Sequence, residues 1–297
     1  MREPVTVACA QVEPVLFDRD ATIDRIGEVA AEAAGKDVQL VLFPEAFIPA
    51  YPSNRWVRYL AGGQDSKAVY AKLARASLEV PSPDSERLGA IAQEHDLWLA
   101  VGANELDGGT IYNSLLLYGP DGEVALHHRK LVPTNHERLV WGQGNGAGLE
   151  AVKTGLGRVG GLICWENFMP LARFALYESG VEIYLAPTAE DSEQRHDSMK
   201  HIARESRAFV LSCCVFQRAS SYPDDVQLAE GDELVGRGGS AILAPDGSYL
   251  AGPLWDEEGI LYAELDPQRL YEERQRFDPA GHYHRPDVFR LKIRRSG

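Results

Sequence analysis

The 297-residue chain has few cysteines, and their spacing argues against two common roles. It contains Cys9, Cys164, Cys213 and Cys214, none of which form a Cys-x-x-Cys pair. A disulfide framework needs a regularly spaced set of cysteines, and a cysteine-based zinc site needs closely paired ligands. Neither is indicated here. We expect the adjacent Cys213 and Cys214 to be core residues, because free cysteine is among the most buried residue types.

Long apolar segments are also missing. No run approaches the roughly 18 apolar residues that a membrane span requires. The N-terminus leads from residues 1–4 straight into a strand-like segment, without the apolar region or cleavage site of a signal peptide. We therefore expect a cytoplasmic protein that does not use a membrane.

Basic residues are fewer than acidic residues. Thirty Lys and Arg stand against 44 Asp and Glu, which gives a formal net charge of −14. Such a charge disfavours nucleic acid and anionic membranes as partners. Hydrophobic residues make up 44% and charged residues 25% of the chain, as in ordinary globular proteins, so it can bury a large core.

Strand and helix patterns alternate along the whole chain, which favours an α/β fold. The apolar runs predict strands over 5–12, 38–43, 97–103, 158–163, 181–185 and 209–216. Helical spacing predicts helices over 20–36, 64–78, 85–95, 170–179 and 196–207.

Two segments share one turn pattern. Pro120-Asp121-Gly122 joins the apolar run 115–118 to 123–127, and Pro245-Asp246-Gly247 joins 241–243 to 248–251. Proline presets φ and glycine tolerates positive φ, so both segments are predicted hairpins. Their recurrence suggests two similar halves within a single domain over 1–297. From about 266 to 297 the chain turns polar, and we expect an extended C-terminal arm that needs a partner surface to order it.

Three strand-like runs end in a reactive side chain: Glu45, Lys130 and Cys164. Ligands of open α/β sheets bind beyond strand ends, so these residues mark the expected site. A desolvated glutamate can accept the proton of a cysteine nucleophile, and a lysine can stabilise the developing negative charge. Cys164 also precedes a helical pattern over 168–177, where backbone N–H groups and the helix dipole are expected to lower the thiol pKa.

Each of these residues has a plainer interpretation on its own. Cys164 could be a small buried apolar residue, Glu45 a solvated loop residue and Lys130 part of an ordinary basic face. Two histidine pairs lack a matching third ligand and are expected to be solvated or hydrogen-bonded rather than metal-bound: His196/His201 and His282/His284.

Taken together, the segments resemble the nitrilase (carbon–nitrogen hydrolase) superfamily. Its three catalytic motifs are matched in the family's order by Phe-Pro-Glu-Ala-Phe (43–47), His-Arg-Lys-Leu-Val-Pro-Thr (128–134) and Cys-Trp-Glu-Asn-Phe-Met-Pro (164–170). Supporting segments extend the resemblance over nearly the whole chain: 137–142, 186–188, 201–205, 238–240 and 282–289.

The resemblance implies Glu45 as general base and acid, Lys130 as electrostatic stabiliser and Cys164 as nucleophile. It implies Glu137 as a second glutamate that holds the lysine and the attacking water. A helix-start carboxylate or a structural salt bridge near Arg138 would also explain this residue. The Trp165 backbone N–H would help to stabilise the anion. The implied fold is a four-layer α-β-β-α sandwich of two β-sheets flanked by helices. The implied chemistry requires no metal or organic cofactor.

Family membership also implies an assembly. Homodimers form through helices near the nucleophile, exchange C-terminal arms, and in the nitrilase branch often stack into spirals. One departure concerns this assembly: residues 144–147 read Gly-Asn-Gly-Ala, where the branch usually has an acidic Gly-Asp-Gly. The lost charge bears on oligomer geometry more than on chemistry.

The motif Cys164-Trp165-Glu166-Asn167 is similar to nitrile-hydrolysing members. The implied reaction converts a small organic nitrile to a carboxylic acid and ammonia through a thioimidate and a thioester. Tyr51 and Trp165 are candidate substrate-binding residues, and Trp56 could line a pocket or simply pack. The alternatives are an amidase, a carbamoylase or a cyanide-hydrating enzyme of the same fold, and a non-catalytic scaffold. The choice among aliphatic, aryl and arylacetic nitriles stays open.

Overall fold

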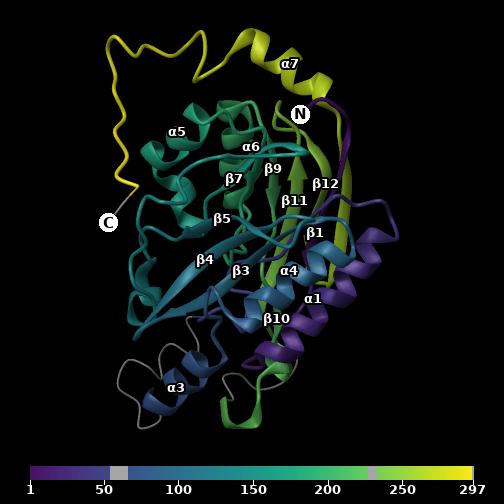
Figure 1. Cartoon of the computed structure of the whole chain (residues 1–297), viewed down its shortest axis with the longest axis vertical. Coiled ribbons are helices and arrows are strands. Elements are labelled where there is room, and N and C mark those ends of the chain that lie inside the picture. Colours follow the sequence, from purple (N-terminus) through teal and green to yellow (C-terminus); the bar gives the residue numbers. More distant parts are fainter. Residues whose placement is uncertain (54–65, 227–232, 296–297) are drawn as a thin grey trace.

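A computed structural model describes residues 1–53, 66–226 and 233–295, which form two β-sheets with helices on their outer faces (Figure 1). The first sheet contains, in spatial order, β13 (Gly259–Leu265), β1 (Val5–Gln11), β2 (Leu40–Leu42), β3 (Trp98–Asp107), β4 (Thr110–Tyr118) and β5 (Val124–Arg129). The second contains β10 (Phe216–Arg218), β11 (Leu234–Leu243), β9 (Phe209–Ser212), β8 (Ile183–Leu185), β7 (Gly157–Gly161) and β6 (Val152–Thr154), with β12 (Tyr249–Trp255) paired to β11. The α-helices are α1 (Arg19–Ala34), α3 (Ser66–Ala76), α4 (Pro83–Glu94), α5 (Pro170–Glu178), α6 (Gln194–Ser206) and α7 (Pro267–Arg276).

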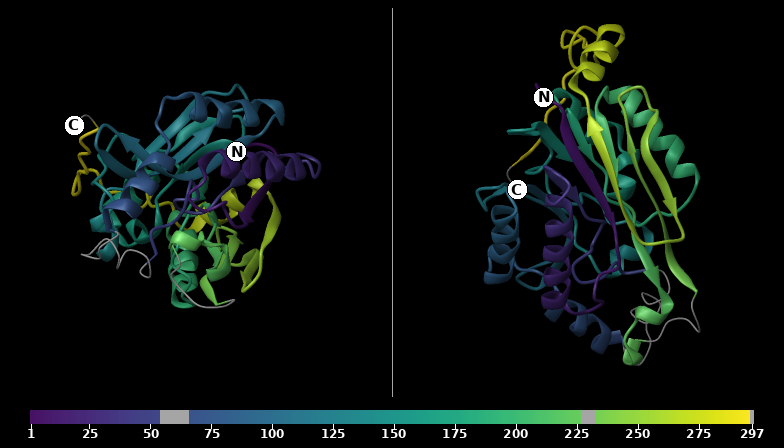
Figure 2. Two further views of the ribbon diagram at one scale, coloured as in Figure 1. Left: turned by 90° about the horizontal axis from the view of Figure 1, so that it is seen from below. Right: turned by 90° about the vertical axis from the view of Figure 1, so that its right-hand side faces the viewer.

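Side chains along each strand alternate between two hydrophobic clusters, one on each face of the sheet. In β1, Val7 and Cys9 enter the core between the two sheets, whereas Ala8 and Ala10 pack in the cluster with residues of α1 and α4. A third cluster joins the second sheet to α5 and α6. Successive side chains along a strand therefore point to opposite faces, and both faces of each sheet are packed. The result is four layers (Figure 2). This arrangement confirms the predicted α-β-β-α sandwich.

The two halves share one topology. In the first, β1, β2 and β3 are parallel and β4 returns antiparallel to pair with β5. In the second, β7, β8 and β9 are parallel, and β11 returns antiparallel to pair with β12. The predicted hairpins are β4–β5 and β11–β12. Because both halves contribute to one inter-sheet core, we propose that residues 1–297 form a single domain.

The predicted strand over 209–216 is wrong in its extent. β9 ends at Ser212, because the next backbone groups leave the ladder for other partners. The Cys214 N–H donates to Ser240 Oγ at 2.8 Å, and the Val215 N–H donates to the Thr188 carbonyl at 2.9 Å. Cys213 and Cys214 are fully buried, as expected of core residues.

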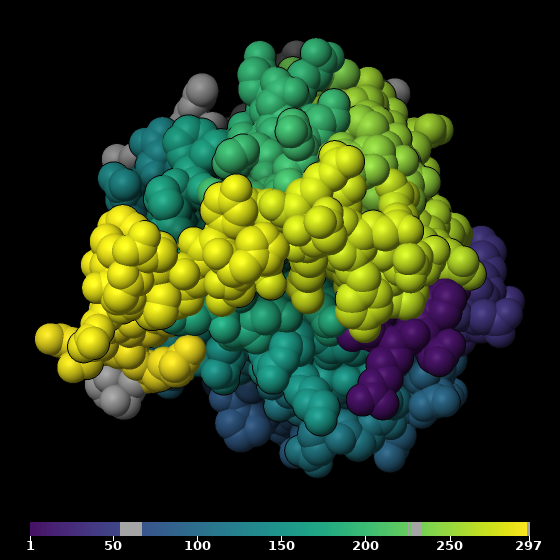
Figure 3. Space-filling model, turned by 90° about the horizontal axis from the view of Figure 1, so that it is seen from above, coloured from purple at the N-terminus to yellow at the C-terminus, as the bar shows by residue number. Residues whose placement is uncertain are grey.

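We predicted an extended C-terminal arm, but part of the arm is helical. Asp266 caps α7 by accepting the Gln268 N–H at 2.9 Å, and Pro267 fits the first helical position. Beyond the helix the chain crosses the surface (Figure 3) and packs on its own second half, where Leu291 and Ile293 join the cluster under α5 and α6. The predicted helix over 64–78 begins at Ser66 in the described part of the chain, and residues 64 and 65 lie outside it. None of the helices described is long and apolar enough to span a membrane.

Loss of packing between the sheets should destabilise the protein measurably. Val159 on β7 is fully buried in the inter-sheet core, whereas Val124 on β5 is 39% exposed. We expect Val159→Ala to lower the free energy of unfolding by about 2 kcal/mol, because it removes two methyl groups and leaves a cavity. Val124→Ala is the matched control, with a change below about 0.5 kcal/mol. Equal losses in urea unfolding of the two variants would contradict this assignment of the core.

Candidate active site

Three strand ends bring their reactive side chains together. Glu45 follows β2, Lys130 follows β5 and Cys164 follows β7, and all three are buried. Single carboxylate oxygens of Glu45 and Glu137 and the Sγ of Cys164 lie within 4.8 Å of one another. The structure thus joins residues from three separate segments of the chain, which follow strands of two different sheets.

The Lys130 ammonium lies between the two carboxylates. Its Nζ donates to Glu45 Oε1 at 2.8 Å and to Glu137 Oε2 at 2.7 Å. Burial by itself lowers the pKa of Lys130, but Glu45, Cys164 and Glu137 together raise it above its ordinary value. Lys130 is therefore a fixed positive charge in the resting site.

Glu45 is held by donors on both oxygens. Besides Lys130, Asn113 Nδ2 donates to Oε1 and the Ala189 N–H donates to Oε2, each at 2.7 Å. Burial, assisted by Glu137, raises the pKa of Glu45 despite the opposing effect of Lys130 and Asn113. A carboxylate with a raised pKa can both accept and return a proton near neutral pH. Gly102 on β3 leaves room for this turn, because a Cβ there would lie 2.1 Å from the Pro44 carbonyl.

Glu137 bonds both the start of a helical turn and the Lys130 ammonium. It lies in the short 3₁₀ helix η1 (Asn135–Leu139), where its Oε2 accepts the Thr134 N–H at 2.6 Å as well as Lys130. Its Oε1 accepts the Tyr51 hydroxyl at 2.8 Å. The residue therefore caps a helical turn and fixes the ammonium at the same time.

Cys164 stands on a turn with left-handed backbone geometry, φ 53°. Its N–H donates to the Pro187 carbonyl at 2.9 Å, which anchors the turn to the segment after β8. It opens the 3₁₀ helix η2 (Cys164–Phe168), whose first-turn N–H groups, including that of Trp165, have no earlier carbonyl of the helix to bind. The sharp turn predicted from the sequence is present.

The predicted lowering of the Cys164 pKa is wrong. Burial of the thiol, followed by the charge of Glu45, raises its pKa above the ordinary value, and Lys130 offsets only part of this. The helix α5 begins at Pro170, too far along the chain for its dipole to act strongly at the sulfur. The thiol is therefore neutral at rest and needs a base at the moment of attack.

Glu45, Glu137 and Cys164 are spaced as metal ligands could be. The Lys130 ammonium, however, bonds both carboxylates and takes the position of a cation between them. Two of the four histidines considered as ligands have ordinary contacts: His196 Nδ1 lies 3.0 Å from the Tyr249 hydroxyl, and the His284 ring packs on Phe174. The absence of a metal cofactor stays a prediction.

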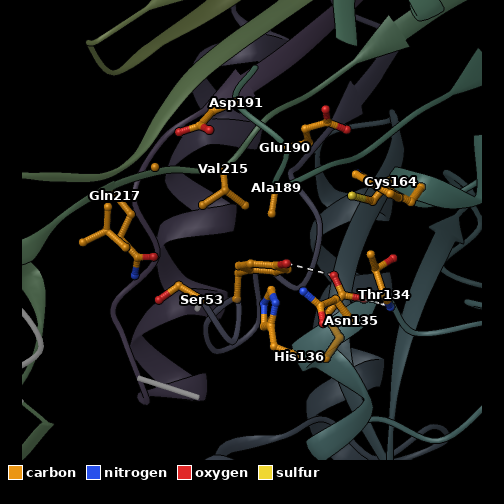
Figure 4. A pocket seen from close by; sticks show the side chains of 15 residues that line it. Ser53, Thr134, Asn135, His136, Cys164, Ala189, Glu190, Asp191, Val215 and Gln217 are labelled. Atoms are coloured by element: carbon orange, nitrogen blue, oxygen red, sulfur yellow. Dashed lines mark hydrogen bonds between the residues drawn. The ribbon is translucent and has the colours of Figure 1, made fainter. Parts of the chain in front are cut away.

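A cavity of about 610 Å³ opens over Cys164 (Figure 4). Val215 and Ala189 lie between the cysteine at one end and the polar side chains of Gln217 and Ser53 at the other. Gln217 Nε2 and Ser53 Oγ are buried and have no hydrogen-bond partner among the described residues. The cavity wall is therefore mixed, with Val215 and Ala189 among mostly polar side chains.

Both predicted substrate-binding residues line this cavity. Tyr51 does so while it donates to Glu137, and its ring packs edge-on against Trp141. Trp165 is half exposed beside Cys164. Trp56 lies outside the described residues.

Asn113 is a polar contact that the sequence did not reveal. It lies within β4, is buried, and donates to Glu45. Asparagine is depleted in strands, so an Asn inside the run 110–118 was the available signal. Its role depends on a residue 68 positions away, which no local pattern reports.

Comparisons with known proteins agree with this geometry. A sequence model of the carbon–nitrogen hydrolase family matches residues 6–275. The chain is 40% identical to nitrilase 1 of Arabidopsis thaliana, over 97% of this chain and 86% of that protein. It is also 40% identical to an aliphatic nitrilase of Sinorhizobium fredii (strain HH103), over 96% and 94% respectively. The chain belongs to the carbon–nitrogen hydrolase family.

Solved structures support the fold. Nit3 of Saccharomyces cerevisiae, a member of branch 10 of the nitrilase superfamily, has a TM-score of 0.75 at 20% identity and covers 95% of this chain and 97% of its own. A carbon–nitrogen hydrolase from Helicobacter pylori G27 has a TM-score of 0.72 at 21% identity, with 96% and 97% covered.

The charge arrangement predicts an unusual effect of neutralising the base. Because Glu45 raises the pKa of Cys164 and shares Lys130, we expect Glu45→Gln to lower the thiol pKa. The thiolate absorbance near 240 nm, followed against pH and corrected with Cys164→Ala, measures this pKa. Glu105→Gln is the control, because Glu105 is a buried carboxylate bonded to Arg129 rather than to the site. An unchanged or higher midpoint in Glu45→Gln would show that the carboxylate does not act on the thiol.

Proposed function

We propose that the protein is a nitrilase, which hydrolyses a small organic nitrile to the carboxylic acid and ammonia. The observation that carries this proposal is the buried Cys164 thiol beside a Lys130 ammonium that two carboxylates hold. The relatives at about 40% identity that cover most of the chain are named nitrilases, which supports a nitrile as substrate.

The reaction begins with proton transfer from Cys164 to Glu45. The sulfur forms a bond to the nitrile carbon, and the proton passes to the nitrogen, which gives a thioimidate. Since the pKa of the thiol is raised and so is that of Glu45, the thiolate forms only as the attack proceeds.

Two water molecules complete the reaction. Glu45 takes a proton from the first water, which adds to the thioimidate carbon, and ammonia leaves with a returned proton to give a thioester. A second water, activated in the same way, displaces the thiol and releases the acid. Lys130 and the Trp165 N–H stabilise the negative charge in the tetrahedral steps, and Glu137 holds Lys130 in place.

The same tetrahedral intermediate can lose the thiol instead of ammonia, and the product is then an amide. A relative from Lupinus angustifolius, 39% identical over 98% of this chain, is named a bifunctional nitrilase/nitrile hydratase. The fold alone is shared with an amidase from Nesterenkonia sp., at a TM-score of 0.67 and 21% identity. The partition between acid and amide depends on which leaving group Glu45 protonates.

We further propose a homodimer formed next to the active site, with larger spirals built from it. Three large apolar side chains on η2 and α5 are exposed: Trp165 (50%), Phe168 (49%) and Leu171 (70%). An exposed apolar group of this kind favours a protein partner. The C-terminal arm lies on its own chain here, and exchange between subunits remains part of this proposal.

A cytoplasmic location is also proposed. All four cysteines are free, which suits a reducing compartment.

Ammonia release tests the reaction. Wild-type protein should release ammonia from at least one member of a panel of aliphatic, aryl and arylacetic nitriles, and Cys164→Ala should show none above background. A matched amide panel is the control for the substrate class. Ammonia from amides alone would reject the nitrilase proposal and favour an amidase.

The proposed dimer surface can be tested separately. We expect Leu171→Asp to shift the protein toward the monomer in size-exclusion chromatography with light scattering, because it places a charge on an apolar contact. Val15→Asp is the control, since Val15 is exposed (44%) and lies before α1. A monomeric wild type, or an unchanged mass for Leu171→Asp, would contradict the surface.

A further inference from the structure

Glu166 is a buried carboxylate separate from the Glu45–Lys130–Glu137 group. It lies two residues after Cys164, in η2, and is 1% exposed. It does not line the cavity over Cys164. The reaction described above gives it no proton to transfer, so its burial needs another explanation.

The contacts of Glu166 lead to both reactive segments. Its Oε2 accepts the N–H of Ile163 at 2.8 Å, and Ile163 directly precedes Cys164. Its Oε1 accepts the N–H of Leu131 at 2.6 Å, and Leu131 directly follows Lys130. The Nε2 of His128, two residues before Lys130, lies 3.0 Å from Oε2. One carboxylate thus holds the chain beside the nucleophile and on both sides of the lysine.

These contacts keep Glu166 ionised. Burial alone raises the pKa of a carboxyl group, but His128 and the two backbone N–H donors hold the pKa of Glu166 below its ordinary value. A charged carboxylate offers two acceptor oxygens and no donor, which matches two N–H groups that need partners. A glutamine at this position would direct its NH₂ at one of those N–H groups.

The fold explains why such a connection is needed. Lys130 follows β5 of the first sheet, and Cys164 follows β7 of the second. No strand pairing joins these two sheets in the described part of the chain, so no backbone ladder sets the distance between ammonium and thiol. Packing between sheets is less directional than hydrogen bonding. The Glu166 carboxylate bridges the gap with hydrogen bonds.

We propose that Glu166, with His128, is a positioning residue that fixes Cys164 relative to Lys130. The proposal rests on the proposed cysteine hydrolase function but not on the nitrile as its substrate. Glu166 acts through the backbone of its neighbours and touches no reacting atom. Its loss should therefore impair the chemical step and leave substrate binding nearly intact.

The first test is Glu166→Gln, which keeps the size of the side chain and removes the charge. We expect kcat to fall about 10- to 100-fold with KM changed less than about threefold, because a small misplacement of reacting groups costs this much. The activity is measured on whichever nitrile or amide the wild type hydrolyses. Failure of the nitrilase proposal is then distinguishable from failure of this one.

A matched control separates positioning from general stability. Glu182 accepts the Arg158 N–H at 2.8 Å at the opposite end of β7. Glu182→Gln should keep kcat near the wild-type value even if its melting temperature falls. A folded Glu166→Gln with kcat within threefold of wild type would overturn the proposal, and so would an equal loss of kcat in Glu182→Gln.

A second variant covers the case in which Glu166→Gln does not fold. His128→Gln removes one partner and leaves both backbone N–H bonds, so we expect a smaller loss of kcat in a folded protein. If Glu166→Gln does fold, the double variant should lose much less than the product of the single losses, because the two residues act as a unit. A His128→Gln enzyme with unchanged kcat, or fully independent effects, would overturn the paired role.

Discussion

The site depends on one buried ammonium that two carboxylates share. Lys130 bonds Glu45 and Glu137 at hydrogen-bond distance, and all three side chains are almost completely shielded from water. Unpaired, any of these charges would be costly to bury. Burial of the thiol, followed by the charge of Glu45, raises the pKa of Cys164 more than Lys130 lowers it, so the resting cysteine stays protonated. Cys164 thus stays in its less reactive thiol form until a substrate brings an electrophilic carbon to it.

The same arrangement explains the raised pKa of Glu45. Its three donors stabilise the carboxylate, yet burial and the nearby Glu137 outweigh them. If Glu45 were fully exposed, its pKa would be too low for it to return a proton to a departing amine. Burial therefore raises the pKa of both the proton donor, Cys164, and the proton acceptor, Glu45.

Sequence patterns predicted the alternation of strands and helices, the hairpins and the three strand ends, because these follow from hydrophobic periodicity and turn chemistry. The four layers were implied by the family resemblance. The sequence patterns missed β6 and β13, since a three-residue strand and a half-exposed one carry little periodic signal. The α7 helix was missed because its residues are mostly polar, although Asp266 and Pro267 are a recognisable start. The thiol pKa was predicted with the wrong sign, since burial and the charge of Glu45 are tertiary properties. The contacts of Asn113 and Glu166 likewise join segments that only the folded chain brings together.

The repeated topology divides the chemistry unequally between the halves. The first half supplies two carboxylates, Glu45 and Glu137, and the Lys130 ammonium, but no nucleophile. The second supplies Cys164 together with the Ala189 N–H that steadies Glu45. Neither half carries all of the reactive side chains. Catalysis therefore requires that both halves be folded and packed face to face.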